Sequence, residues 1–114
     1  MVLLRTIFVS LPVLALAACN TPAPQPSQAS YQSLPAGVSP TTFRLPDQPG
    51  CQGDVARFQA LIENELATGH TTQSVRDAVT ADLSKAQAAC TAGRGAEASA
   101  MVTSIRKKFG YPGS

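Results

Sequence analysis

Three cysteines and one histidine carry most of the reactive chemistry in this chain of 114 residues. The thiols of Cys19, Cys51 and Cys90 could form disulfides or bind a metal ion, and His70 could add one nitrogen ligand. Cys51 and Cys90 are 39 positions apart, so they and His70 lack the close ligand spacing of a zinc motif. We therefore expect no metal site and no cofactor, and the cysteines need another explanation.

The first cysteine ends a segment that is organised like an export signal. Arg5 precedes an apolar stretch over residues 7–17, which at about 11 residues is shorter than the roughly 20 that a membrane-spanning helix needs. The motif Leu16-Ala17-Ala18-Cys19 at its end resembles a bacterial lipobox, the cleavage site of envelope lipoproteins. The alternative is an ordinary secretory signal cleaved near residues 15–17, which would leave Cys19 as a thiol.

The resemblance to a lipoprotein implies that residues 1–18 are a signal peptide and that Cys19 becomes the N-terminus. Cys19 would then carry a covalent lipid, with a thioether-linked diacylglycerol and an amide-linked acyl chain such as palmitate. Several chains anchor a protein stably, where one chain binds a membrane only marginally. Asn20 follows the cysteine in place of the Asp that marks inner-membrane retention, so we expect an outer-membrane lipoprotein that faces the periplasm. The remaining chain resembles only the broad class of small Gram-negative envelope lipoproteins.

The two later cysteines are predicted to pair with each other. An odd number of cysteines in an exported protein requires an explanation, and assigning Cys19 to the lipid leaves Cys51 and Cys90. Oxidising compartments outside the cytosol favour a disulfide between them.

Residues 19–50 differ sharply in composition from residues 51–114. Seven prolines fall between residues 20 and 50, which favours extended chain over helix or sheet. We expect the lipidated N-terminus and a disordered Pro-rich tether here, with a fully extended reach on the order of 95 Å at 3.1 Å per residue. Several apolar side chains complicate this interpretation: Tyr31, Leu34, Val38, Phe43 and Leu45. Either part of residues 31–46 folds back over the helical domain, or the segment is a docking strip for a partner.

Residues 51–114 are predicted to form an all-α domain, a small three-helix bundle. The helices are expected at residues 54–68, from about 71–74 to 93, and at 95–109, with Asp54 as the first N-cap and Gly69 as the first stop. Each carries an apolar stripe at helical spacing. The stripes are Val55, Phe58, Ile62 and Leu66; Val75, Val79, Leu83, Ala86 and Cys90; and Ala98, Met101, Val102, Ile105 and Phe109.

The register of an antiparallel helical hairpin agrees with the predicted disulfide. If the first two helices turn near residues 69–71, facing residues have numbers that sum to about 141, and Cys51 and Cys90 meet this condition. The same register places Phe58 opposite Leu83 and Ile62 opposite Val79. The third helix would return along the hairpin, with its alanines allowing close approach.

A catalytic site is not expected. His70, Ser74 and Asp77 lie within eight residues, but a hydrolytic triad is assembled from separated segments around an oxyanion hole. Residues 74–77 instead have the form of a helix-start capping box. The carboxylates of Glu63 and Glu65 are two residues apart and cannot share one helical face.

The remaining candidate binding residues are Arg106, Lys107, Lys108 and Tyr111. They could contact lipid phosphates, cell-wall carboxylates or an acidic protein surface. Alternatively, the cations only stabilise the helix C-terminus, and the register brings Arg106 near Glu63. After removal of Arg5 the chain keeps eight Lys+Arg against seven Asp+Glu, a net charge of +1, which argues against nucleic acid as a partner.

These features together predict a non-enzymatic binding or scaffolding module of the cell envelope. The expected partners are a membrane, through the lipid anchor, and an envelope protein or peptidoglycan. The alternative is an inhibitor or regulator of a periplasmic or host hydrolase, such as a wall hydrolase, that uses residues 63–72 at the hairpin tip as a plug.

Overall fold

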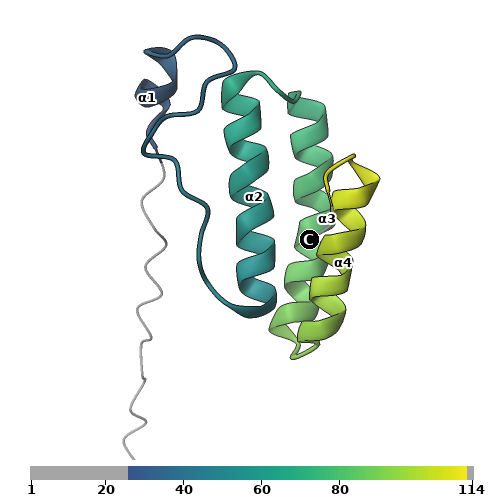
Figure 1. The fold of residues 1–114 in the computed structure, drawn as a ribbon. Helices are drawn as coiled ribbons and strands as arrows, with labels where there is room; N and C mark the ends of the chain where they lie inside the picture. The colour runs from purple at the N-terminus through teal and green to yellow at the C-terminus, as the bar shows by residue number, and fades with distance from the viewer. Residues whose placement is uncertain (1–25, 113–114) are drawn as a thin grey trace, which may run out of the picture.

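The computed structural model describes residues 26–112, and within this range the chain is all-α with no strand. A short helix α1 (Gln28–Gln32) precedes three long helices, α2 (Gly50–Thr68), α3 (Gln73–Thr91) and α4 (Gly95–Lys108). The long helices form a three-helix bundle in which each contacts the other two (Figure 1). The lipobox-like motif and Cys19 lie outside the described residues. No helix within residues 26–112 has both the length and the apolar character needed to cross a membrane.

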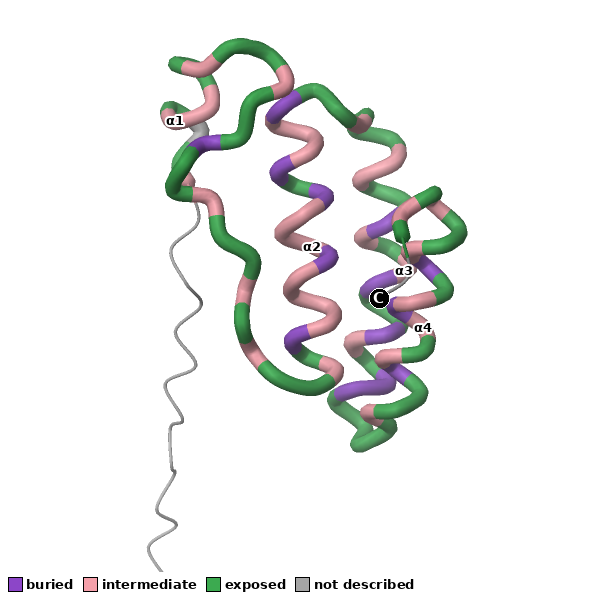
Figure 2. The backbone as a smooth tube through the Cα atoms, viewed as in Figure 1, coloured by how far each residue is buried: buried purple, intermediate pink, exposed green. Residues whose placement is uncertain are grey.

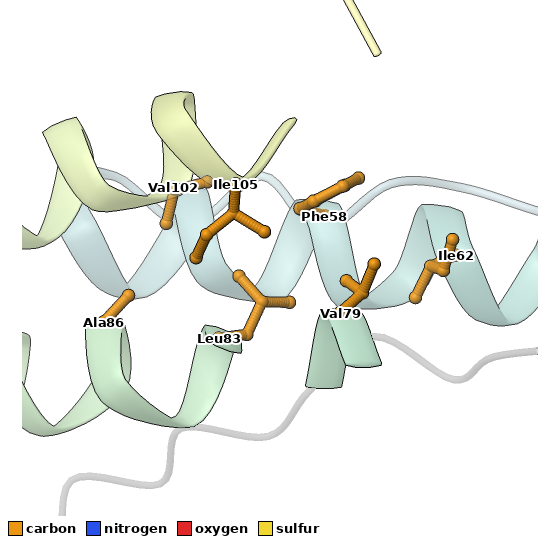
Figure 3. Close-up of a cluster of buried hydrophobic side chains, with 7 residues drawn as sticks. All are labelled: Phe58, Ile62, Val79, Leu83, Ala86, Val102 and Ile105. Carbon is orange, nitrogen blue, oxygen red and sulfur yellow. The ribbon is translucent and has the colours of Figure 1, made fainter. Parts of the chain in front are cut away.

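The buried side chains form a core along the faces that the apolar stripes predict (Figures 2 and 3). Phe58 and Ile62 of α2, and Val79 of α3, are completely inaccessible to solvent. The other members of the main core are Leu83, Ala86, Val102 and Ile105. A second, smaller cluster of Ala89, Cys90 and Ala98 lets α3 and α4 approach closely near their connection.

The predicted hairpin and its disulfide are both confirmed. Cys51 and Cys90 are bonded, with their Cα atoms 5.8 Å apart. An independent contact supports the register, since the Gln59 side-chain nitrogen lies 3.2 Å from the Thr80 hydroxyl. The bond therefore joins the N-terminal turn of α2 to the C-terminal turn of α3.

The start of α2 differs from the prediction. The helix begins at Gly50, four residues before the predicted start, and its N-cap is Pro49, so Asp54 is not a cap. Helix propensity disfavours glycine at positions 50 and 53, but packing requires one at 53. A Cβ atom on Gly53 would lie 1.6 Å from the carbonyl oxygen of Gln48. The predicted stop at Gly69 is correct, and its φ of 82° is in the left-handed region.

The predicted capping box at Ser74 is wrong. Thr72 caps α3, because its side-chain oxygen accepts a 3.3 Å hydrogen bond from the Val75 amide. Ser74 lies inside the first turn and its hydroxyl contacts that of Thr72 at 3.0 Å. Two adjacent threonines and a serine all have capping chemistry, so local sequence did not distinguish them.

Residues 31–48 form a strap that runs along α2 (Figure 1). At one end, the Tyr31 hydroxyl donates to Asn64 Oδ1 at 2.9 Å, and Asn64 Nδ2 donates to Ser39 Oγ at 2.8 Å. At the other end, Arg57 Nη1 donates to the Gln48 carbonyl at 2.7 Å. The alternative in which this segment folds back over the helical domain is therefore the one observed, with the addition of α1, which was not predicted.

Replacing Gly53 with alanine is expected to loosen the strap. The added methyl group displaces the Gln48 carbonyl, and such overpacking typically costs about 1–3 kcal/mol, more than the gain of up to 1 kcal/mol from removing a helical glycine. The strap carries a trypsin site at Arg44, so cleavage there should accelerate. Urea unfolding and timed trypsin digestion measure both effects. Gln52→Ala, on an exposed position of α2, is the control; equal cleavage rates for the two variants would contradict the packing assigned to Gly53.

Candidate binding groove between α2 and α4

The three C-terminal cations that are predicted to bind a partner, Arg106, Lys107 and Lys108, lie in different environments. Lys108 Nζ lies 2.7 Å from Asp82 Oδ2, and Lys85 approaches the other oxygen of Asp82 at 3.2 Å. The hydrogen bond from Lys108, followed by that from Lys85, lowers the pKa of Asp82 below its usual range. Lys108 also lies over the Phe109 ring, 5.1 Å from its centroid. Lys107 is exposed and has no ion-pair partner within residues 26–112.

Tyr111 closes the C-terminal end of the fold over α2. Its hydroxyl donates a hydrogen bond to Glu65 Oε2, and its ring meets Phe58 edge-on with centroids 5.1 Å apart. Burial, with a further contribution from Glu65, raises the pKa of Tyr111 to about 12. These contacts give Tyr111 an intramolecular role, and its proposed part in binding stays a prediction.

The shift in Tyr111 predicts a loss of stability at high pH. Because the pKa is higher in the folded chain than the usual value of 10.0, the neutral phenol stabilises the fold below pH 10, and this contribution is lost between about pH 10 and 12. Tyr111→Phe removes the hydrogen bond and should lower the free energy of unfolding by about 1 kcal/mol at neutral pH, after allowance for solvent screening. Urea unfolding at pH 8, 10 and 11.5 should show the two proteins converging. A constant difference across these pH values would count against this assignment.

Arg106 is held in a fixed orientation by two contacts. Its guanidinium lies over the Phe58 ring, 5.6 Å from the centroid, and its Nε donates to the Pro112 carbonyl at 3.0 Å. The helix register predicts that Arg106 lies near Glu63. Glu63 instead forms a salt bridge with Arg76, with 3.8 Å between Glu63 Oε1 and Arg76 Nη1. Within residues 26–112, the two terminal nitrogens of Arg106 make no hydrogen bond or salt bridge. The N–H groups on these two nitrogens therefore have no acceptor among the described residues and can donate to a ligand.

Arg106 lines a groove between α2 and α4 that has a volume of about 550 Å³. The groove is lined by Asp54 and Arg57 of α2 and by Ser99, Ala100, Val102, Thr103 and Arg106 of α4. This α2–α4 groove unites one of the predicted binding residues with polar groups that were not predicted as site residues. Ser99, Thr103 and Arg106 are spaced four and three residues apart, and this shared helical face was the available signal.

The acidic group in the groove is already satisfied. Asp54 Oδ1 accepts from Arg57 Nη2 at 2.5 Å, and Asp54 Oδ2 accepts from the Ser99 hydroxyl at 2.6 Å. The bond from Ser99, then that from Arg57, lowers the pKa of Asp54 below its usual range. Asp54 forms its salt bridge with Arg57, while Arg106 makes a smaller, longer-range contribution to the lowered pKa of Asp54 and forms no salt bridge in the groove lining.

Two other hollows are less favourable for specific binding. One, of about 360 Å³, lies between α3 and α4, and its charged residues Asp82 and Glu97 are paired with neighbouring cations. The other, of about 410 Å³, lies between the strap and α2 over Ala56, Ala60 and Ala67. The α2–α4 groove differs from both because it has an oriented charge without an internal partner.

The three residues considered as a hydrolytic set serve local structure. His70 Nδ1 lies 3.0 Å from the Thr68 hydroxyl, and Asp77 accepts from the Gln73 side chain at 3.0 Å. Ser74 contacts the capping Thr72. Among residues 26–112 there is no group of three or more His, Cys, Asp and Glu side chains that could hold a metal ion.

The described residues define a strap-covered, disulfide-linked three-helix bundle with a basic groove. Comparison with protein-family models, with curated proteins and with solved structures finds no match.

Proposed function

We propose that the protein is a membrane-anchored lipoprotein that serves as a non-enzymatic binding module on the periplasmic side of the cell envelope. The α2–α4 groove is the binding surface. The observation that carries this proposal is Arg106, whose guanidinium is oriented by Phe58 and Pro112 while its terminal nitrogens make no hydrogen bond or salt bridge within residues 26–112. A pre-oriented charged donor loses little conformational freedom on binding, which favours affinity.

The membrane anchor is supported by the resemblance of residues 16–19 to a lipobox. The docked strap shortens the distance that the module can lie from the membrane, because it contains most of the chain that would otherwise act as a tether. Only residues 20–25 separate Cys19 from the described chain, and they can span at most about 22 Å at 3.6 Å per residue. We therefore place the module close to the outer-membrane surface rather than at the 95 Å expected for a free tether.

Removing the acylated residue tests the anchor. Cys19→Ala is expected to shift the protein out of the membrane fraction, since the lipid provides the attachment. Fractionation of cells with quantitative immunoblotting measures the shift. Gln52→Ala, a surface substitution in α2, should stay with the membrane. An unmodified protein found wholly in the soluble fraction would refute the anchor.

Site-specific cross-linking tests the binding surface separately. A photoreactive residue at Ala100, which is exposed and lines the groove, should give a recurring adduct in intact cells. Ala100 also borders the α3–α4 hollow, so there are two control positions: Ser104, which is exposed and lines that hollow but not the groove, and Ala81, which is exposed on α3 and lines none of the three hollows. No adduct from Ala100, or equal adducts from Ala100 and either control position, would contradict the assignment of the groove.

Inhibition of a hydrolase by residues 63–72 stays a prediction. At this tip, Glu63 pairs with Arg76 and Glu65 accepts from Tyr111, so both carboxylates are engaged within the chain. The groove is favoured as the binding surface for this reason.

A further inference from the structure

We propose that the α2–α4 groove binds the terminal carboxylate of a short peptide. This inference rests on the proposed function, because it names the ligand of the same groove. Arg106 supplies the carboxylate donor, and Thr103 accepts from the last peptide N–H.

The charge of the groove selects an anion. Asp54 has both oxygens hydrogen-bonded, by Arg57 and by Ser99, and it forms no salt bridge with Arg106, whose charge acts on Asp54 only at longer range. One Arg57 nitrogen bonds Asp54 and another bonds the Gln48 carbonyl, which leaves Arg106 as the main open donor. A guanidinium binds a carboxylate through two parallel hydrogen bonds, which gives both strength and a defined orientation.

The orientation of Arg106 makes this donor suited to a planar acceptor. Its Nε donates to the Pro112 carbonyl, and its central carbon lies over the Phe58 ring, 5.6 Å from the centroid. The two terminal nitrogens are therefore the groups left to form a two-bond contact. A carboxylate has the matching planar geometry.

Thr103 supplies a neighbouring acceptor for the peptide unit. Its hydroxyl donates to the Ser99 carbonyl at 3.2 Å, so its oxygen keeps a lone pair for a ligand N–H. Thr103 and Arg106 are three residues apart on α4, which places their Cβ atoms about 5–6 Å apart. One peptide residue spans about 3.8 Å between Cα atoms, so a terminal carboxylate and the preceding amide can reach both side chains.

The rest of the lining leaves room for a short peptide. Ala100 and Val102 are the apolar residues of the groove, and both are short. The volume of about 550 Å³ lies within the roughly 300–1,000 Å³ of typical ligand sites. A dipeptide that ends in alanine fits within this volume and is a suitable probe, since such a terminus occurs both in cell-wall peptides and in protein C-termini.

Titration of the purified full chain with small peptides tests the proposal. The probe is acetyl-D-Ala-D-Ala with a free carboxylate, and the matched control is the same peptide with a C-terminal amide. NMR should show saturable shifts at residues 99–106 with the acid, and at least tenfold weaker binding of the amide. The L-Ala-L-Ala form distinguishes the two sources: preference for the D form indicates the cell wall, and equal or tighter binding of the L form indicates a protein terminus.

Arg106→Gln should weaken binding of the acid at least tenfold, and Lys85→Gln, which removes an exposed cation outside the groove lining, should leave it unchanged. Arg106→Lys keeps the charge but loses the two-bond contact, so this variant should bind the acid with intermediate affinity. Circular dichroism of each variant checks that the chain is folded. Equal binding of acid and amide, or tighter binding of inorganic phosphate than of the acid, would overturn the carboxylate assignment. Recurring cross-links from Ala100 together with no peptide binding would refute this ligand while leaving the proposed function intact.

Discussion

Replacing both Cys51 and Cys90 with alanine is expected to lower the free energy of unfolding by about 4 kcal/mol. The bond closes a loop of about 40 residues and restricts the unfolded chain, and the chain-entropy model gives this magnitude for such a loop. A domain of about 60 residues buries a small apolar core, so a loss of this size removes a large share of its stability. Urea unfolding followed by circular dichroism measures the change.

The disulfide prediction has a direct chemical control. Adding a reductant to the unmodified protein should reproduce the loss, and adding it to the double variant should have no effect. Cys19 is kept in both proteins, so its chemistry cancels in the comparison. A double variant within 1 kcal/mol of the unmodified protein would show that the hairpin does not depend on the bond.

Phe58→Ala is expected to destabilise the fold by about 3–5 kcal/mol, the range for truncating a buried aromatic side chain. Phe58 is completely inaccessible to solvent and packs in the main core between α2, α3 and α4 (Figure 3). The substitution also removes the ring that supports Arg106 and meets Tyr111 edge-on. The groove should therefore lose its oriented guanidinium together with part of the core.

A graded series separates these two effects of Phe58. Phe58→Leu keeps most of the apolar volume but removes the aromatic face, so it should be less destabilising than alanine while still loosening Arg106. Val55→Ala, at a half-buried position beside the core, is the size control and should cost less than Phe58→Ala. Urea unfolding ranks the variants, and a Phe58→Ala loss below that of Val55→Ala would contradict the placement of Phe58 at the core centre.

The sequence predicted the parts of the fold that depend on periodic burial. The stripe through Phe58 and Ile62 and the stripe through Val79 and Leu83 each fixed one helix face, and their register also brought Cys51 to Cys90. These features follow from helical spacing and from the need to bury apolar area, and a single sequence contains both.

Contacts between distant segments were less accessible to sequence reasoning. The strap is held by Tyr31 and Asn64, which are 33 residues apart, and helix propensity gives no sign of that pairing. The same limit explains the start of α2, because glycine at 53 disfavours helix locally while its missing side chain admits the Gln48 carbonyl. Packing outweighed propensity at both places.

The candidate site was predicted in part. The C-terminal cluster of cations indicated Arg106 as a candidate. Its neighbours were predicted from the helix register alone, and register does not determine whether the guanidinium contacts a carboxylate or an aromatic ring. The structure places Arg106 on Phe58 and ties Lys108 to Asp82. Cations that are adjacent in the sequence are therefore divided between a groove and an internal ion pair.

Intact-mass analysis of the protein purified from membranes, with and without reductant, tests the central claim that a lipid-anchored chain carries a disulfide-linked module. We predict a chain that lacks residues 1–18, carries acyl mass on the peptide containing Cys19, and has Cys51 and Cys90 joined until reductant is added. A chain that retains Met1, or that has an unmodified Cys19, would contradict the anchor. Free thiols at Cys51 and Cys90 in the unreduced sample would contradict the disulfide-linked module.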